Sequence, residues 1–195
     1  MFEAKNYENL IGLPGFSERL LRNHFTLYEA YVTNANKIME TIAGFQIDEK
    51  MATLEYAELK RRFGWEYDGM RLHELYFENI AKEKCVIDQD SQLYNKITED
   101  FGSFDNFIKQ FMATGAMRGI GWVVLYFDTK ADKLIIAWIN EHDTGHLAGC
   151  APILVMDVFE HAFMIDYETK KASYIEAFMK VACWSVASDR FAEAK

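Results

Sequence analysis

A carboxylate and an imidazole lie four residues apart at the end of an apolar segment of this chain. Residues 152–156 are apolar, Asp157 follows them directly, and His161 comes four positions later. An apolar strand that ends in this way delivers two ligands to one point beside a buried core. Carboxylate and imidazole are ligands that suit iron and manganese. The same spacing also arises by chance on helix surfaces, so the pair alone leaves a metal site and a solvated pair as alternatives.

Two further histidines, His24 and His73, lie in segments whose apolar residues repeat at helical spacing. Each alone is more simply interpreted as a buried core histidine, because neutral imidazole tolerates burial. Together with Asp157 and His161 they form a set of three imidazoles and one carboxylate, which fits a redox-active metal. A di-iron helical bundle is excluded because none of the 5 histidines follows a glutamate at the third position. The zinc protease motif is excluded too, since His73 and Glu74 are not followed by a second histidine at the required spacing.

The elements that must position His24 and His73 are two long helices. Ser17 can cap a helix, and the apolar repeat from Leu20 predicts that this helix runs to about Ala43. A second helical pattern covers residues 52–80, with a pause at residues 63–65. Two long helices with a moderately long connection favour an antiparallel hairpin.

After residue 84 the pattern changes to shorter elements. Ser103 is a suitable helix cap, and two stretches rich in β-branched and aromatic residues flank a polar turn, which indicates a β-hairpin. The half that follows the helices is therefore predicted to mix helices and strands. The expected elements are helices at 90–101 and 103–117, strands at 119–127, 134–139 and 153–157, and a last helix at 172–191.

Composition narrows the function classes. The formal net charge is -9, and no basic stripe is available to neutralise phosphates, which argues against a nucleic-acid partner. Residues 1–15 lack a basic start followed by an apolar core, and no apolar run is long enough for a membrane span, so we expect a cytoplasmic protein without a membrane partner. The three cysteines, Cys85, Cys150 and Cys183, are odd in number and widely spaced, which predicts reduced thiols.

Motifs spread over nearly the whole chain carry a resemblance to a known family. They are Tyr31-Val32-Thr33-Asn34-Ala35-Asn36, His73-Glu74-Leu75-Tyr76-Phe77-Glu78-Asn79, Phe101-Gly102-Ser103-Phe104, Gly121-Trp122, Asp157-Val158-Phe159-Glu160-His161-Ala162 and Ile165-Asp166-Tyr167. In this order they resemble the iron/manganese superoxide dismutases, and the D-V-x-E-H-A motif is the most specific of them.

The resemblance implies that His24, His73, Asp157 and His161 bind one iron or manganese ion per subunit, with a solvent molecule as fifth ligand. It implies an α+β fold: a long antiparallel helical hairpin, placed in residues 1–87, and an α/β domain with a three-stranded antiparallel sheet in residues 88–195. The implied enzyme is an oxidoreductase that disproportionates superoxide to dioxygen and hydrogen peroxide. A metal-binding homologue without this activity is the alternative, and the sequence does not choose between iron and manganese.

The resemblance also assigns residues around the metal. Tyr31 matches a tyrosine at the mouth of the substrate channel, Trp122 a tryptophan that walls the site, and Phe159 a wall position that is usually tryptophan. Glu160 matches a glutamate that reaches the neighbouring subunit's metal-binding histidine, which implies a homodimer, with a tetramer as a further option.

Positive charge near the channel is expected to steer the superoxide anion. Lys170 and Lys171 are the candidates for this role, and a solvated lysine pair is the alternative.

This chain departs from the family pattern in the first helix. His24 precedes Tyr31 by seven residues instead of eight, and we expect His24 to keep the ligand position, with relatives carrying an extra residue as a π-bulge. Tyr28 and Met164 replace a histidine and a tyrosine that hydrogen-bond between subunits, so Tyr28 is expected to fill the space at the gateway.

A second departure concerns the residue that hydrogen-bonds the metal-bound solvent, commonly a glutamine. Gly69 occupies one of its two usual places, so we expect His142 to take the other, with its second nitrogen held by a neighbour. His146 is interpreted as a surface or loop histidine.

Overall fold

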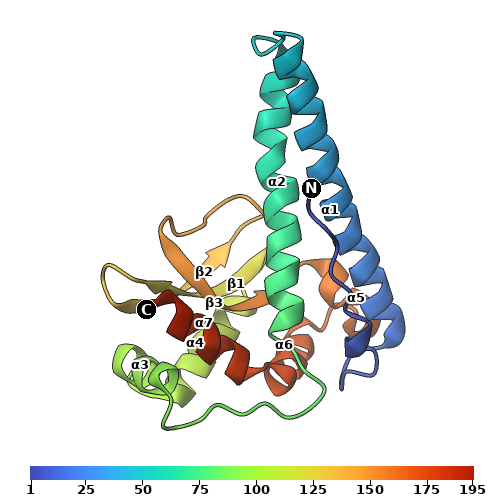
Figure 1. Cartoon of the computed structure of the whole chain (residues 1–195). Helices are drawn as coiled ribbons and strands as arrows, with labels where there is room; N and C mark the ends of the chain where they lie inside the picture. Colours follow the sequence, from blue (N-terminus) through green and yellow to red (C-terminus); the bar gives the residue numbers. More distant parts are fainter.

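The computed structural model describes residues 1–195, and two long antiparallel helices form its N-terminal part: α1 (Glu18–Ile47) and α2 (Leu54–Glu78). The Ser17 side chain caps α1 by accepting a hydrogen bond from the backbone N–H of Leu20 at 3.1 Å. The first helix runs beyond the predicted end at Ala43, and α2 continues without a break through residues 63–65. The far end of this hairpin projects away from the rest of the molecule (Figure 1).

The second part mixes short helices with one sheet, as predicted. Its strands form an antiparallel sheet in the order β2-β1-β3, with α2 and α7 against β3 and with α3 and α4 against β2 (Figure 1). The α+β fold with a helical hairpin and a three-stranded antiparallel sheet is therefore confirmed, whereas the domain division at residues 87 and 88 stays a prediction. The elements are α3 (Gln92–Phe101), α4 (Phe104–Gly115), β1 (Trp122–Asp128), β2 (Lys133–Ile139), β3 (Cys150–Asp157), the 3-10 turn η2 (Glu160–Ala162), α5 (Met164–Tyr167), α6 (Lys171–Val181) and α7 (Trp184–Ala194).

The register of the sheet brings Trp122 and Asp157 together at one end. Trp122, the first residue of the central strand β1, pairs with Asp157, the last residue of β3. The β1–β3 register shifts near Pro152, which has no N–H to donate and lies on an edge strand where proline is tolerated. One cluster of buried apolar side chains extends from the base of the hairpin through the sheet, so the end of β3 lies beside an apolar core.

The single final helix predicted at residues 172–191 is wrong, because the structure has two helices there, α6 and α7. Ala182 is extended (ψ 125), and the chain at this point pairs with the segment that leaves α2: the N–H of Ala81 donates to Val181 at 2.9 Å, and the N–H of Cys183 donates to Asn79 at 2.8 Å. A backbone partner from a distant segment interrupts the helix here. The spacing of apolar residues along the chain does not reveal such a partner.

The expectation of three reduced cysteines is also wrong for two of them. Cys85 and Cys183 form a disulfide between Cα atoms 4.7 Å apart and 98 residues apart in sequence, while Cys150 is free. The same pairing of distant segments that breaks the last helix brings these sulfurs together.

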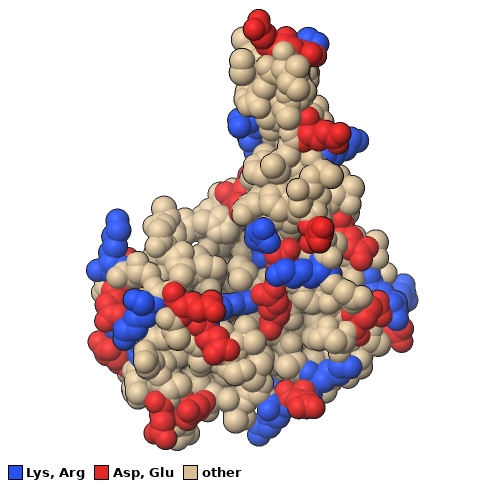
Figure 2. All heavy atoms as spheres, in the orientation of Figure 1, with Lys and Arg blue, Asp and Glu red and all other residues tan.

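Acidic and basic side chains are interspersed over the face in Figure 2, on a chain with net charge -9. None of the helices is long and apolar enough to span a membrane.

Candidate metal centre

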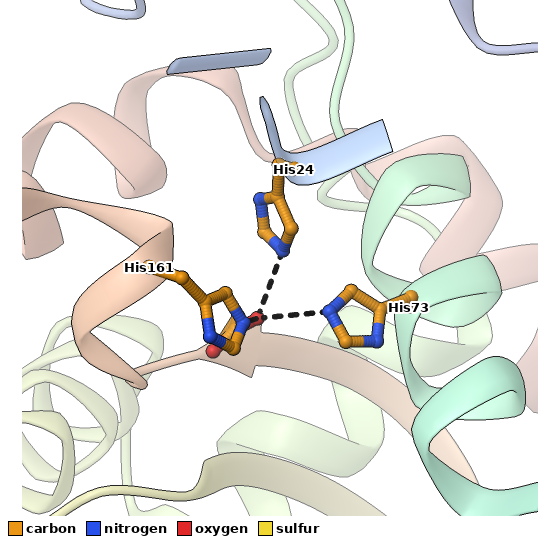
Figure 3. Close-up of side chains that lie close together, drawn as sticks. His24, His73 and His161 are labelled. Atoms are coloured by element: carbon orange, nitrogen blue, oxygen red, sulfur yellow. Dashed lines mark hydrogen bonds and ion pairs between the residues drawn. The ribbon is translucent and has the colours of Figure 1, made fainter. Parts of the chain in front are cut away.

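Four predicted ligands meet between the hairpin and the end of β3 (Figure 3). Nε2 of His24 and Nε2 of His161 each lie 3.1 Å from Oδ2 of Asp157, and Nε2 of His73 lies 3.6 Å from the same oxygen. One ligand atom from each residue lies within 4.8 Å of all the others. Asp157, His24 and His73 are buried, and only His161 is partly exposed. The structure thus brings together the four side chains that the sequence selected.

The donor set fits a metal ion. Nδ1 of His73 faces the backbone carbonyl of Gly69, so this nitrogen carries the proton and Nε2 presents its lone pair to the cluster. That Nε2 atom is fully buried and has no hydrogen-bond partner in the protein. An unpaired buried nitrogen is costly unless something binds it. Iron and manganese both accept imidazole and carboxylate ligands.

The carboxylate of Asp157 is held in place from the backbone side. Its Oδ1 accepts the N–H of Phe159 at 2.8 Å, which leaves Oδ2 directed to the three histidines. The hydroxyl of Tyr174, on α6, donates to the main-chain carbonyl of Asp157 at 2.6 Å. These bonds fix both the strand end and the side chain before any ion binds.

The protonation states suit metal binding, which needs ionised carboxylate and neutral imidazole. Burial lowers the pKa of His24, and burial together with the neighbouring His24 lowers the pKa of His73 well below its usual value. Burial alone would raise the pKa of Asp157, but His161 and His24 outweigh it and hold that pKa below its ordinary range. At neutral pH Asp157 is therefore an anion, and His24 and His73 beside it are neutral imidazoles.

A chain of side chains runs from Trp122 through His142 to Tyr31 beside the cluster. The indole N–H of Trp122 donates to Nδ1 of His142 at 3.1 Å, and Nε2 of His142 lies 2.7 Å from the Tyr31 hydroxyl. Because an indole N–H can only donate, Nδ1 must accept, and neutral His142 carries its proton on Nε2. The Tyr31 oxygen therefore accepts the hydrogen bond from Nε2–H of His142, and the Tyr31 O–H is free to donate to another group.

Aromatic side chains wall the cluster. The rings of Tyr31 and His73 stack with centroids 5.2 Å apart, and Trp122 meets His73 edge-on at 5.0 Å. Phe159 stacks on His142 at 4.6 Å and on His161 at 5.2 Å. These contacts place Trp122, Phe159 and Tyr31 around the four predicted ligands, while their roles in the reaction stay predictions.

Comparisons with known proteins all indicate one family. The family profile described as iron/manganese superoxide dismutases, C-terminal domain, matches residues 89–190. The iron superoxide dismutase of Aquifex pyrophilus is 32% identical over 98% of this chain and 92% of its own length. That of Cupriavidus metallidurans is 34% identical over 93% of this chain and 91% of its own length. A manganese superoxide dismutase of Halobacterium salinarum is 32% identical over 93% of this chain and 89% of its own length.

The chain belongs to the iron/manganese superoxide dismutase family. The resemblance inferred from the motifs is thereby confirmed. The relatives include iron and manganese proteins, which leaves the metal of this family member open.

The short spacing in α1 of this dismutase-family chain needs no distortion. The helix is regular from Glu18 to Ile47, and seven residues turn it through about 700°, only about 20° short of two full turns. His24 and Tyr31 therefore share one face and both reach the cluster. Gly69 supports the arrangement from α2, since an added Cβ would lie 2.6 Å from Cδ1 of Tyr31.

Tyr28 has hydrogen-bond partners within the chain. It is fully buried, its hydroxyl donates to Oε1 of Glu74 at 3.0 Å, and it accepts the N–H of Lys5 at 2.9 Å. The side chain thus anchors the N-terminal segment on the hairpin, and its part in the gateway between subunits stays a prediction. Met164 is exposed and has no group that could replace the missing hydrogen bond.

His146, interpreted from the sequence as a surface or loop histidine, has structural partners. Its Nε2 donates to the carbonyl of His142 at 2.7 Å, and its Nδ1 accepts the hydroxyl of Tyr126, on β1, at 2.9 Å. His146 therefore holds the backbone of the loop that carries His142. No local pattern marks this role, because both partners depend on how the loop folds over the sheet.

Two other residues near the site also escaped the sequence analysis. Trp65, on α2, meets the ring of His142 edge-on at 4.7 Å. Arg62 lies over the Trp65 ring, at 5.1 Å from its centroid. Burial raises the pKa of Tyr31, and Arg62 opposes part of this rise, so its positive charge acts on the site.

The predicted steering lysines differ in their surroundings. Nζ of Lys171 donates to the carbonyls of Met117 at 2.8 Å and Gly119 at 3.2 Å, so this lysine ties α6 to the loop before β1. Lys170 is exposed at the start of α6. Steering of an anion by these lysines stays a prediction.

Proposed function

We propose that this chain is a superoxide dismutase with one iron or manganese ion held by His24, His73, Asp157 and His161. The observation that carries the proposal is the buried, unpartnered Nε2 of His73 within a cluster whose other ligand atoms lie within 4.8 Å. The named activity of the relatives supports the reaction. When bound, the ion supplies one-electron chemistry, by which one superoxide is oxidised to dioxygen and a second is reduced to hydrogen peroxide.

The chain's own part in this reaction is to hold the ligands, exclude water and deliver protons. Asp157 and His73 are pre-oriented by the hydrogen bonds of Phe159 and Gly69, so the fold fixes the orientation of these two ligands. The aromatic wall keeps bulk water from the reacting centre. Peroxide leaves only when protonated, so a donor must stand near the substrate.

Tyr31 is the donor we propose. Burial raises its pKa, which keeps the hydroxyl protonated at neutral pH. The phenol oxygen accepts the hydrogen bond from Nε2 of His142, which leaves the phenol proton free to be donated to the substrate. Trp122 fixes this polarity through Nδ1 of His142. His142 thus acts through Tyr31, which modifies the expectation that it donates directly to the metal-bound solvent.

We also propose a homodimer in which Glu160 of one subunit binds His161 of the other. Within the chain His161 uses only Nε2, toward Asp157, and its side chain is 27% exposed. Glu160 is exposed, and Met164 and Ile165 beside it are exposed apolar residues. A buried dimer surface would cover these side chains. Sedimentation analysis of Glu160→Ala against the unchanged chain tests it, and an unchanged dimer would remove this role of Glu160. The cytoplasmic location stays a prediction from the sequence.

The function is tested on protein loaded separately with iron and with manganese. Metal content per chain and superoxide consumption are measured on the same samples. We expect at least one metal to give activity in proportion to its occupancy. A fully loaded protein that consumes no superoxide with either metal would contradict the proposal and favour a metal-binding homologue.

The role of His142 is tested with a matched pair of variants. His142→Gln keeps one donor and one acceptor, whereas His142→Ala keeps neither. We expect the alanine variant to retain its metal, to lose turnover and to shift the metal's reduction potential, while the glutamine variant retains most of its turnover. Equal and unchanged kinetics in both variants would refute the role.

A further inference from the structure

The chain that leaves α2 passes beside the turn between α6 and α7 (Figure 1). Cys85 belongs to the first of these segments and Cys183 to the second, and the two form a disulfide. Backbone hydrogen bonds join these segments, with the N–H of Trp184 donating to the carbonyl of Cys85 at 3.2 Å and the N–H of Cys183 to Asn79 at 2.8 Å. The backbones are thus held side by side by bonds other than the disulfide. A reduced pair would keep its two sulfurs close.

The surroundings of Cys85 suit a reactive thiol. Its sulfur accepts the N–H of Ser185 at 3.4 Å, in the first turn of α7. Free N–H groups and the dipole at a helix N-terminus stabilise a thiolate over a thiol. Cys85 also lines a groove of about 510 Å³ together with Lys82, Lys84 and Lys180, so the groove that a peroxide would enter carries basic side chains. Cys183, the N-cap residue of α7, is only 8% exposed and is less accessible than Cys85, and its sulfur lies 3.3 Å from Oγ of Ser185.

We propose that Cys85 and Cys183 form a reversible redox site, with Cys85 as the thiol that reacts with a peroxide and Cys183 as the thiol that resolves it. The Cys85 thiolate attacks the O–O bond of hydrogen peroxide, takes one OH as a sulfenic acid, and the other oxygen leaves as water after protonation. The Cys183 thiol then attacks the Cys85 sulfur, the S–S bond forms and a second water leaves. Two thiols are oxidised and one peroxide is reduced to two waters. A dithiol reductant reverses the change.

The oxidised pair clamps elements that hold the candidate metal centre. Asn79, which pairs with Cys183, is buried, accepts the N–H of Val155 on β3 at 2.8 Å, and donates to its carbonyl at 3.1 Å. Val155 stands two residues before Asp157. The α6 helix that ends at this junction carries Tyr174, the donor to the Asp157 carbonyl. This consequence, unlike the redox chemistry, rests on the proposed metal site.

The redox chemistry is tested by counting thiols. In denaturant the reduced chain should give three free thiols, and the peroxide-treated chain one, from Cys150. Dithiothreitol added to the folded, peroxide-treated protein should restore three. A disulfide that dithiothreitol reduces only after unfolding, or a pair that remains as thiols after peroxide treatment, would overturn the proposal.

The order of attack is tested with dimedone, which labels sulfenic acids: Cys183→Ser should be labelled at Cys85, and Cys85→Ser should not be labelled at Cys183. Labelling at Cys183 would reverse the assignment.

The clamp is tested on metal-free protein by thermal unfolding. A cross-link closing a loop of this length should raise the unfolding temperature by about 10 °C on oxidation. Cys150→Ser should keep this shift, and Cys85→Ser should lose it. Metal loss to a chelator should be slower from the oxidised than from the reduced protein. Equal loss rates would remove the link to the metal site while the thiol counts still decide the redox site.

Discussion

Gly69 is the point where α2 lets the Tyr31 ring approach, and replacing it with alanine perturbs that approach directly. An added Cβ would lie 2.6 Å from Cδ1 and 2.8 Å from Cε1 of Tyr31. The ring has little freedom to move, because it stacks on His73 and its hydroxyl is bonded to Nε2 of His142 at 2.7 Å. A methyl group at Gly69 must therefore push Tyr31 away from His142.

The size of the effect follows from two opposing contributions. Alanine is favoured over glycine in a helix interior by about 1 kcal/mol. Overpacking a filled site costs about 1 to 3 kcal/mol. Gly44 on α1 provides the matched control, since an added Cβ there meets nothing within 4 Å. We expect Gly44→Ala to raise the free energy of unfolding by about 1 kcal/mol. The free energy of unfolding of Gly69→Ala should be about 1 to 3 kcal/mol lower than that of this control.

Urea unfolding of the metal-free variants measures this difference without a contribution from metal binding. Turnover of the metal-loaded variants gives an independent readout: Gly69→Ala should be impaired with its metal retained, and Gly44→Ala should match the unchanged chain. If both alanines stabilise the protein equally and Gly69→Ala keeps full turnover, the argument that glycine is required for the Tyr31 position is wrong.

Three further predictions concern the site. Asp157→Asn should abolish metal retention, measured by elemental analysis, because the amide cannot supply the one anionic ligand; stoichiometric metal would contradict it. Burial lowers the pKa of His142 from 6.5 to about 4. At a pH between these two values, His142 is therefore protonated in the unfolded chain and neutral in the folded one. The free energy of unfolding of the metal-free protein should therefore fall by about 3 kcal/mol more than that of His142→Gln as the pH drops through this range; parallel pH profiles would exclude it. His146→Ala should cost about 1 to 2 kcal/mol of stability through two lost hydrogen bonds and lower turnover with metal content intact, whereas unchanged kinetics would show that the loop positions His142 without it.

The features that the sequence predicted are those with local signals. Capping by Ser17 and Ser103, helical periodicity and the β-hairpin pattern each depend on neighbours in the chain, and the structure reproduces them. Asp157 and His161 could be selected as ligand candidates because Asp157 ends an apolar strand and His161 follows it at short range. Their meeting with His24 and His73 requires the hairpin to pack on β3, which the resemblance implied.

The features that were missed depend on contacts between distant segments. The break between α6 and α7 and the Cys85–Cys183 pair both come from the chain that leaves α2, and neither changes the local periodicity. His146 was interpreted as a loop residue because its partners, Tyr126 and the His142 carbonyl, are defined only by the folded loop. Spacing along the chain has no means of showing such bonds.

The seven-residue spacing between His24 and Tyr31 is explained by helix geometry. A regular helix turns about 100° per residue, so seven residues return to within about 20° of the same face, whereas eight overshoot it by about 80°. The longer spacing implied by the resemblance therefore needs a local distortion to bring both side chains to one site, and this chain does not. Its α1 is regular throughout, and the His24 and Tyr31 rings both contact His73. The seven-residue spacing thus makes the candidate metal centre compatible with an undistorted backbone, and the departure in the sequence does not argue against the proposed ligand.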